Sequence, residues 1–304
     1  MKTRMLALVM VAWFGSIATY AQKDYTFKVL VNKGKNEVKA ADGWQLVKVG
    51  ASLKPSDELK LSENSYMGLV HVSGKPMELK QAGKYKVDEL ASKVSGGTSV
   101  LNKYTDFILS SNTTKRNSMT ATGAVHRGSD KADLYLPEAE NPVVYNNEII
   151  ITWDAAKIPG PYVVSFNSMF GDELEKMEAK ESNVKVNLSS SNFENEDNIL
   201  VTVSSKSDPN KVSKEYTLKK LSKADKERIK NSLNEISSSL AEKTAMDQYI
   251  LAGFYEENNL IIDAITAYQE AIRLAPDVPS FQEDYNTFLI RHGLKDGLKE
   301  VKKK

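Results

Sequence analysis

The spacing of hydrophobic residues divides this chain of 304 residues into regions of two kinds. Over residues 24–90 and 143–221, apolar and polar positions tend to alternate in short runs, such as 25–31 and 162–166. A period of two is typical of strands with one buried face. From residue 222 onward, apolar residues recur every three or four positions, which is typical of amphipathic helices. The pattern predicts a multidomain β + α protein, in which two β-modules precede a helical region.

Clusters of Gly, Pro, Asn and Asp mark turns between the strands of both β-modules. In the first module, which favours a small sandwich or roll, we expect strands at 25–31, 45–49, 58–61, 66–72, 77–79 and 83–87. In the second module we expect strands at 148–153, 162–167, 174–179, 183–188, 198–204 and 213–218. Trp153 ends the first of these, and we expect its side chain between two sheets. This second module resembles immunoglobulin-like or fibronectin-type sandwiches without a disulfide, an architecture that hosts many unrelated functions.

Residues 91–142 are predicted to connect the two β-modules. A helical pattern is present at 99–109, whereas residues 110–118 are Ser, Thr, Asn, Lys and Arg, a composition that favours a solvated loop. Residues 119–128 contain glycines with His126 between them. We interpret this last stretch as an irregular segment or edge strand, with an anion-binding nest as the alternative.

The helical region, residues 222–294, begins with a helix-capping pattern. Ser222 stands three residues before Asp225, as in a capping box. We expect a helix at 223–241, two helices folded back on each other within 244–277, one more helix at 279–291 and a solvated basic tail at 295–304.

The hairpin within 244–277 resembles a tetratricopeptide (TPR) repeat. Small and aromatic residues occupy its signature positions at the spacing of the family: Leu251, Ala252, Tyr255, Ala264, Tyr268, Ala271 and Pro276. The aromatic residue expected near the repeat start is missing, and Gln248 stands there. The alternative is an ordinary helical hairpin. The resemblance implies a scaffold that binds a partner and catalyses no reaction.

In TPR proteins the first helix of each repeat lines a concave groove, so the resemblance also implies a partner-binding site. Carried over by position, this site consists of Met246, Tyr249, Gly253, Glu256, Glu283, Thr287 and Ile290. Tyr249 would be the anchor, because tyrosine combines a large apolar face with a hydroxyl. The two glutamates would make the groove acidic and favour a basic partner segment. The alternative is that helix 223–241 folds into the groove and fills it.

The first β-module is similar to the β-domain of FecR-type envelope proteins. The similarity is carried by turns and strands at 44–50, 53–57, 65–71 and 77–85. Gly50, Leu53 and Asp57 fit the turn pattern of that family, but Ser56 stands where glycine is expected. The resemblance implies a fold more than a role. Iron-uptake signalling is not carried over, because the chain offers no membrane span to relay a signal.

Residues 1–21 have the form of an export signal. Two basic residues precede an apolar run at 5–17, and small residues precede a cleavage point before Gln22, with cleavage after Ala18 as a second option. The run is shorter than the roughly 20 residues that span a membrane, and a retained membrane anchor is the alternative. We expect a periplasmic or otherwise exported protein without a transmembrane segment after cleavage.

Composition narrows the classes of function. The chain has no cysteine, which excludes disulfides, thiolate metal sites and lipid attachment at a processed cysteine. It has 41 basic and 40 acidic side chains, and the signal contains two of the basic ones, so the mature chain has a net charge of −1. This balance gives no electrostatic reason to expect a nucleic acid or an anionic membrane as partner.

The sequence shows no catalytic constellation. His71, His126 and His292 lie in different predicted segments without ligand-spaced neighbours, so we expect no metal and no cofactor. It contains neither a Gly-rich phosphate loop between a strand and a helix nor a Gly-x-Ser-x-Gly elbow. Two functions remain: a protein–protein interaction scaffold that uses the TPR-like helices, or a polysaccharide- or peptidoglycan-binding envelope module that uses the β-modules. Exposed aromatic residues, with Trp44 and Tyr85 as candidates, would favour the second, and a structural spacer is a third possibility.

Overall fold

The computed structural model describes residues 25–40, 43–118, 134–137 and 143–295. They form fifteen strands and six helices, so the fold combines β-sheets with helices, as the hydrophobic spacing predicts. The predicted signal at 1–21, the stretch 119–128 and nearly all of the basic tail lie outside the described residues. Among the described helices, none is both long enough and apolar enough to cross a membrane.

The N-terminal β-module consists of two four-stranded sheets with the strand orders β4-β1-β6-β7 and β3-β2-β5-β8. Its strands are β1 Phe27–Lys33, β2 Glu37–Ala40, β3 Gly43–Leu46, β4 Ser52–Leu53, β5 Glu58–Leu61, β6 Tyr66–His71, β7 Pro76–Leu79 and β8 Gly83–Lys86. Helix α1 (Val87–Ser92) follows. The sequence pattern does not predict β2 or β4, and the two residues of β4 are too few to establish an alternation.

The sheet β4-β1-β6-β7 is buried on both faces. Phe27 and Val29 of β1 face the core of the N-terminal β-module. Leu30 and Val31 belong to a second core, which continues into the helices. A register shift between Val29 and Val31 in the pairing with β6 marks a bulge at this point. The bulge interrupts the alternation of side chains, so Leu30 and Val31 both reach the second core. The N-terminal β-module therefore needs the helices to cover one side of this sheet.

The central β-module also has two sheets, with the strand orders β10-β13 and β12-β11-β14-β15-β9. Its strands are β9 Val143–Val144, β10 Glu148–Thr152, β11 Tyr162–Ser168, β12 Glu173–Ala179, β13 Asn183–Asn187, β14 Asn198–Ser205 and β15 Tyr216–Lys220. Buried residues of both sheets, such as Ile149 and Phe166, share one core with Trp153. This confirms the predicted place of Trp153. Burial alternates along β11 and β14, which is the period that the sequence shows.

The remaining helices are α2 Leu101–Ser118, α3 Lys223–Ser237, α4 Ala245–Glu257, α5 Ile261–Leu274 and α6 Pro279–Arg291. The predicted cap of α3 is confirmed, since the Ser222 hydroxyl accepts the Asp225 N–H at 3.1 Å. Helix α3 ends before residue 241, and the buried Ser239 then contacts the N-terminal β-module. There its hydroxyl accepts the Thr98 N–H at 3.0 Å, and its carbonyl accepts the Lys75 ammonium at 3.3 Å.

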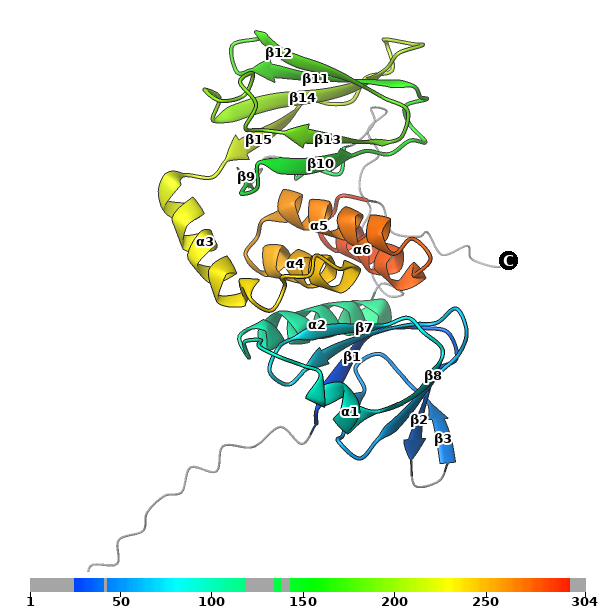
Figure 1. The fold of residues 1–304 in the computed structure, drawn as a ribbon. Coiled ribbons are helices and arrows are strands. Elements are labelled where there is room, and N and C mark those ends of the chain that lie inside the picture. Colours follow the sequence, from blue (N-terminus) through cyan, green and yellow to red (C-terminus); the bar gives the residue numbers. More distant parts are fainter. Residues whose placement is uncertain (1–24, 41–42, 119–133, 138–142, 296–304) are drawn as a thin grey trace, which may run out of the picture.

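Helices α2, α4, α5 and α6 form a layer between the two β-modules, which we call the helical layer (Figure 1). Helix α2 continues through residues 110–118, where the composition predicts a solvated loop, so that prediction is wrong. Tyr104 and Ile108 of α2 are buried against the other helices, and Asn112 bonds to Tyr249. Such tertiary contacts override the weak helix propensity of Ser, Thr and Asn. The predicted helical region 222–294 shares its cores with both β-modules.

Candidate interaction surfaces

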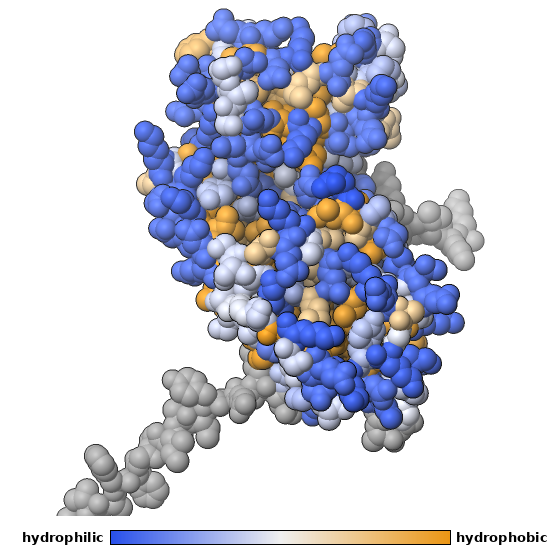
Figure 2. Space-filling model, viewed as in Figure 1, coloured by the Kyte–Doolittle hydropathy of each residue, from blue (hydrophilic) through white to orange (hydrophobic). Residues whose placement is uncertain are grey.

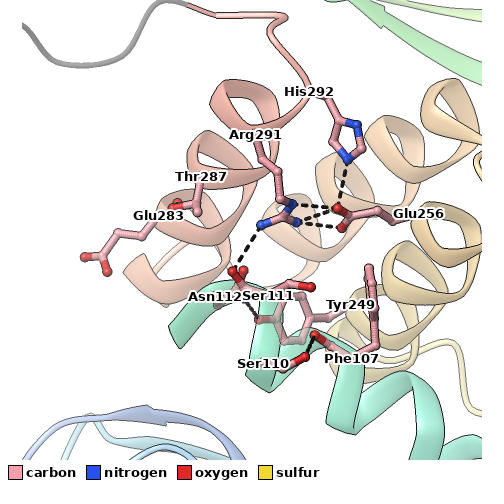
Figure 3. A network of polar contacts seen from close by, with 10 residues as sticks. All are labelled: Phe107, Ser110, Ser111, Asn112, Tyr249, Glu256, Glu283, Thr287, Arg291 and His292. Atoms are coloured by element: carbon pink, nitrogen blue, oxygen red, sulfur yellow. Dashed lines mark hydrogen bonds and ion pairs between the residues drawn. The ribbon is translucent and has the colours of Figure 1, made fainter. Parts of the chain in front are cut away.

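The groove that the TPR resemblance implies is occupied in this structure. Glu283 is exposed, and five of the seven predicted groove residues are buried: Met246, Tyr249, Gly253, Glu256 and Thr287. Ile290 is half-buried. Helix α2 packs on α4 and α6 (Figure 3), and Met246 lies over Gly68 of β6, where a Cβ would overlap the methionine sulfur. The prediction of an open partner groove is therefore wrong for this arrangement. The occupants are α2 and the N-terminal sheet, rather than residues 223–241.

Gly253 allows α2 and α4 to approach each other closely. A Cβ at this position would lie 2.6 Å from Cγ1 of Ile108 and 2.7 Å from its Cδ1, which is well inside van der Waals separation. One residue further on, the Phe254 ring packs edge-on against Tyr104 with ring centroids 5.1 Å apart. The absence of a side chain at Gly253 thus serves helix packing instead of leaving room for a partner.

Tyr249, the predicted anchor, is a core residue. Its ring packs edge-on against Tyr268 and Phe281, with centroid distances of 5.9 and 5.2 Å. Its hydroxyl donates to the Asp284 carboxylate at 2.5 Å and accepts from the Asn112 amide at 3.0 Å. Burial, and then the charge of Asp284, raise the pKa of Tyr249 well above its ordinary value. The phenol stays neutral and joins three helices.

Glu256, which the sequence assigns to an acidic groove, is neutralised inside the protein (Figure 3). Arg291 donates to it through Nε and Nη2, each at 2.7 Å, and Nε2 of His292 lies 2.8 Å from Oε1. The side chains of Glu256 and Arg291 are only 4% and 7% exposed. Arg291 also reaches the Ser111 carbonyl at 3.5 Å. This paired cluster joins α4, α6 and α2, and its carboxylate is not available to attract a basic partner.

The TPR signature residues lie between α4 and α5. The buried ones are Ala252, Tyr255, Ala264, Tyr268 and Ala271, whereas Leu251 is partly buried and Pro276 is exposed just after the C-cap of α5. Asn259 in the turn between the helices has a φ of +57°. Small residues at the helix crossing and tyrosines around it explain the packing. The same burial also suits an ordinary helical hairpin.

A carboxylate from the N-terminal β-module holds the first turn of α4. Glu78 of β7 accepts the Met246 N–H at 2.9 Å and the Tyr66 hydroxyl at 2.7 Å, and Lys80 lies 2.6 Å from its other oxygen. The free N–H groups at a helix start favour such an anion. Burial alone would raise the pKa of Glu78, but the hydrogen bonds from Lys80, Met246 and Tyr66 outweigh it and lower the pKa.

A second carboxylate joins the helical layer to the central β-module. Asp263 of α5 accepts the N–H groups of Tyr145 and Asn146 at 2.9 and 2.8 Å. Thr266, one turn later, accepts the Ile150 N–H on β10 at 2.9 Å. Helix α5 thereby satisfies donors along one edge of the central β-module, an edge that would otherwise need another partner. Burial raises the pKa of Asp263 to about 6 despite these two backbone donors.

The most exposed large hydrophobic side chain of the described residues lies at the tip of the β11–β12 hairpin. Phe170 is 93% exposed, and its neighbour Met169 is 53% exposed. By contrast, the surface seen in Figure 2 is mainly hydrophilic, with hydrophobic residues in small patches over the helical layer and between the sheets of the central β-module. Phe170 therefore stands out as an apolar group that none of the described residues covers.

The turn that presents Phe170 is held by the buried Ser168. Its hydroxyl accepts the N–H groups of Phe170 and Asp172, both at 3.1 Å, and its backbone N–H donates to the Asp172 carbonyl at 2.8 Å. Gly171 has a φ of +94°, a conformation that glycine adopts without strain. The sequence predicts a turn at 170–172 but gives no sign of this exposure. The exposed aromatic ring is thus presented on an ordered tip.

A cleft of about 530 Å³ runs along β7, between the end of α1 and the segment before α4. Two of its three lysines face carboxylates: Lys75 lies 3.0 Å from Glu242, and Lys80 lies 2.6 Å from Glu78. Among the described residues, no group of three or more His, Cys, Asp or Glu side chains could hold a metal ion. His71, at the end of β6, bonds to the Ser73 hydroxyl at 2.8 Å. We assign no chemistry to the cleft.

Comparison with known proteins adds no family to this geometry. The chain matches no protein-family model, and no curated protein matches it. The resemblances to FecR-type β-domains, immunoglobulin-like sandwiches and TPR repeats therefore remain predictions from the sequence.

Proposed function

We propose that this chain is a non-catalytic, exported envelope protein that serves as a protein–protein interaction scaffold. In this proposal the N-terminal β-module is FecR-like, the central β-module is immunoglobulin-like and α4–α6 are TPR-like. The helices act as an internal brace, because α2 and the N-terminal sheet fill the face that would bind a partner. The partner binds instead at the Met169–Phe170 tip of the β11–β12 hairpin.

The observation that carries this proposal is the 93% exposure of Phe170 on a hydrogen-bonded turn. An ordered tip loses little conformational entropy on binding, and a large aromatic side chain is a frequent anchor of protein interfaces. The exposed Asp172 directly follows the tip, whereas the exposed Glu173 is ion-paired with Lys176. Asp172 favours a partner with an apolar pocket and a basic rim, and it disfavours an anionic membrane surface.

Site-specific photocrosslinking tests the proposal. Replacement of Phe170 by the photoreactive analogue p-benzoylphenylalanine keeps an aromatic group at the tip, and irradiation of intact cells should produce one defined protein adduct. The matched control carries the same analogue at Val49, which is 51% exposed in the N-terminal β-module and should give no such adduct. Asp172→Lys combined with the analogue at position 170 should weaken the adduct. The scaffold proposal fails if position 170 gives no protein adduct, or the same adducts as position 49.

A further inference from the structure

The outer face of the sheet β3-β2-β5-β8 carries an unusual combination of side chains. The cross-strand pairs place Leu46, Glu37, Lys60 and Lys84 in one row and Trp44, Lys39, Glu58 and Lys86 in the next. The opposite face, with Val38, Leu59 and Tyr85, packs on the core of the N-terminal β-module. The residues of both rows therefore point away from that core, and together we call them the Trp44 face.

Trp44 is only partly buried, and lysines from other strands reach its ring. The ammonium groups of Lys60 and Lys84 lie 5.9 and 5.7 Å from the indole centroid. Because β3 and β8 are the two outer strands of this sheet, the indole and Lys84 must extend toward each other across it. The result is an aromatic platform with positive charges at its side, next to Leu46, which is 64% exposed.

The Trp44 face carries charged groups of both signs, and Lys60 and Lys84 are direct cross-strand neighbours. Lys39 lies 3.4 Å from Glu58, and Lys60 lies 3.2 Å from Glu37. The face has four lysines and two glutamates, and Lys86 lies 3.0 Å from Glu89 at the start of α1, so the face together with Glu89 has a formal charge of +1. Ammonium groups donate hydrogen bonds and carboxylates accept them, so the face offers both kinds of partner around one aromatic ring.

We propose that the Trp44 face binds an anionic polysaccharide. The indole stacks on the apolar face of one sugar ring, and Lys60 and Lys84 bind an acidic group of the same or the next residue. Glu37 and Glu58 accept hydrogen bonds from sugar hydroxyls. This proposal is independent of the protein partner at Phe170, because the two surfaces lie on different β-modules.

The chemistry of the face favours a polysaccharide over a single-stranded nucleic acid. A nucleic acid carries a negative charge at every phosphate, and Glu37 and Glu58 would repel it. Proteins that bind single strands without sequence preference combine a continuous basic groove with several stacking aromatics, whereas Trp44 is the one aromatic residue of this face. A polysaccharide with sparse acidic groups and many hydroxyls fits a face that carries both lysines and glutamates better.

Titration of the full chain with polygalacturonate, a polymer of uronic acids, tests this proposal. We expect saturable binding that weakens as salt rises, and no comparable binding to the neutral polymer dextran. Trp44→Ala should weaken binding roughly tenfold or more, which is about 1.4 kcal/mol. Lys60→Ala with Lys84→Ala should weaken it by a similar factor and reduce the salt dependence. Lys185→Ala with Lys206→Ala, an equal loss of two positive charges at half-exposed lysines of the central β-module, should leave the affinity unchanged.

Tryptophan emission provides a second reading in the same titration. Trp44 is partly exposed and Trp153 is fully buried, so polygalacturonate should change an emission component that Trp44→Phe removes. Circular dichroism of each variant verifies that the fold is intact. The proposal is overturned if Trp44→Ala binds as tightly as the native chain, if dextran binds equally well, or if oligo-dT binds more tightly than polygalacturonate.

Discussion

Two carboxylates connect the helical layer to the two β-modules, and they do so in opposite ways. At the N-terminal β-module the acid, Glu78, belongs to the sheet and accepts an N–H from the start of α4. At the central β-module the acid, Asp263, belongs to α5 and accepts two N–H groups from the chain before β10. Both side chains bond to backbone donors that lie far away in the sequence.

The difference between the two contacts is electrostatic. Glu78 lies beside Lys80 and accepts the Tyr66 hydroxyl as well, so its pKa is lowered in spite of burial. Burial dominates at Asp263, and its pKa rises to about 6. Similar hydrogen-bond geometry therefore accompanies a stabilised ionised acid at one interface and a disfavoured one at the other. We therefore expect the two interfaces to respond differently to mutation and to pH.

The largest effect is expected from Asp263→Ala, which leaves the Tyr145 and Asn146 N–H groups without their acceptor. Each unsatisfied, partly buried donor costs about 1–3 kcal/mol, so the free energy of unfolding should fall by about 2–6 kcal/mol. Denaturant unfolding at about pH 5, below the pKa of Asp263, measures it. Asp263→Asn retains one acceptor oxygen and should lose less. Equal stability of the alanine variant and the native chain would mean that Asp263 does not stabilise the contact between α5 and the central β-module.

The pH dependence should separate the two acids. The folded-state pKa of Asp263, about 6, lies above its ordinary value of 3.8. Its stabilising contribution is therefore fully present below about pH 4 and is lost as pH rises through about 6. Relative to Asp263→Asn, the native chain should lose up to about 3 kcal/mol of unfolding free energy over this range. Denaturant unfolding of both proteins at several pH values measures this loss. If the native chain gained stability relative to Asp263→Asn as pH rises, the raised pKa of Asp263 would be contradicted.

Glu78→Ala should have a smaller effect, about 1–3 kcal/mol, because Thr244 and Asp247 still cap α4. The pKa of Glu78 is lowered, so its contribution is present at neutral pH and is lost as pH falls through the lowered pKa. In paired unfolding experiments, native chain and Glu78→Gln should therefore converge in acid. Convergence at alkaline pH instead would be the opposite of what this geometry predicts.

Gly253→Ala tests the contact that closes the predicted groove. The added methyl group would overlap Ile108 of α2, and such overpacking costs about 1–3 kcal/mol, partly offset by the better helix propensity of alanine, about 1 kcal/mol. Thermal unfolding should show a net loss. Ile108→Ala in the same chain makes room for the methyl group and should make Gly253→Ala neutral or stabilising. An unchanged cost in the Ile108→Ala background would mean that α2 does not lie against Gly253.

Local patterns in the sequence predict many of the elements correctly. The strand at Glu58–Leu61 and the helix at Pro279–Arg291 agree with the structure in both bounds, because turn residues and a proline at the helix start mark them. The cap at Ser222 is confirmed for the same local reason. Strand β4, with two residues, is too short to give a pattern, and the four-residue strand β2 is not predicted from the sequence.

The sequence does not predict what covers the α4 and α6 surface. Residues 110–118 are polar and suggest a loop, yet they continue α2, whose Asn112 bonds to Tyr249 more than a hundred residues away. Position in a repeat correctly places Ala264 and Tyr268 in a core. The same reasoning wrongly predicts that Tyr249 and Glu256 are exposed in a groove, because the repeat pattern carries no information about a helix from outside the repeat that covers them. The exposure of Phe170 likewise depends on which elements lie beyond the hairpin tip.

If the helices act as the internal brace proposed above, the helical layer should hold the two β-modules at one fixed separation. The chain has no cysteine, so spin labels can be attached uniquely at Lys48→Cys in the N-terminal β-module and Lys180→Cys in the central β-module, both exposed positions. Pulsed electron paramagnetic resonance should give a single narrow distance distribution for this pair. The same pair with Asp263→Ala and Glu78→Ala should give a broad one. A broad distribution in the chain with intact Asp263 and Glu78, or a narrow one that persists without both acids, would contradict the account.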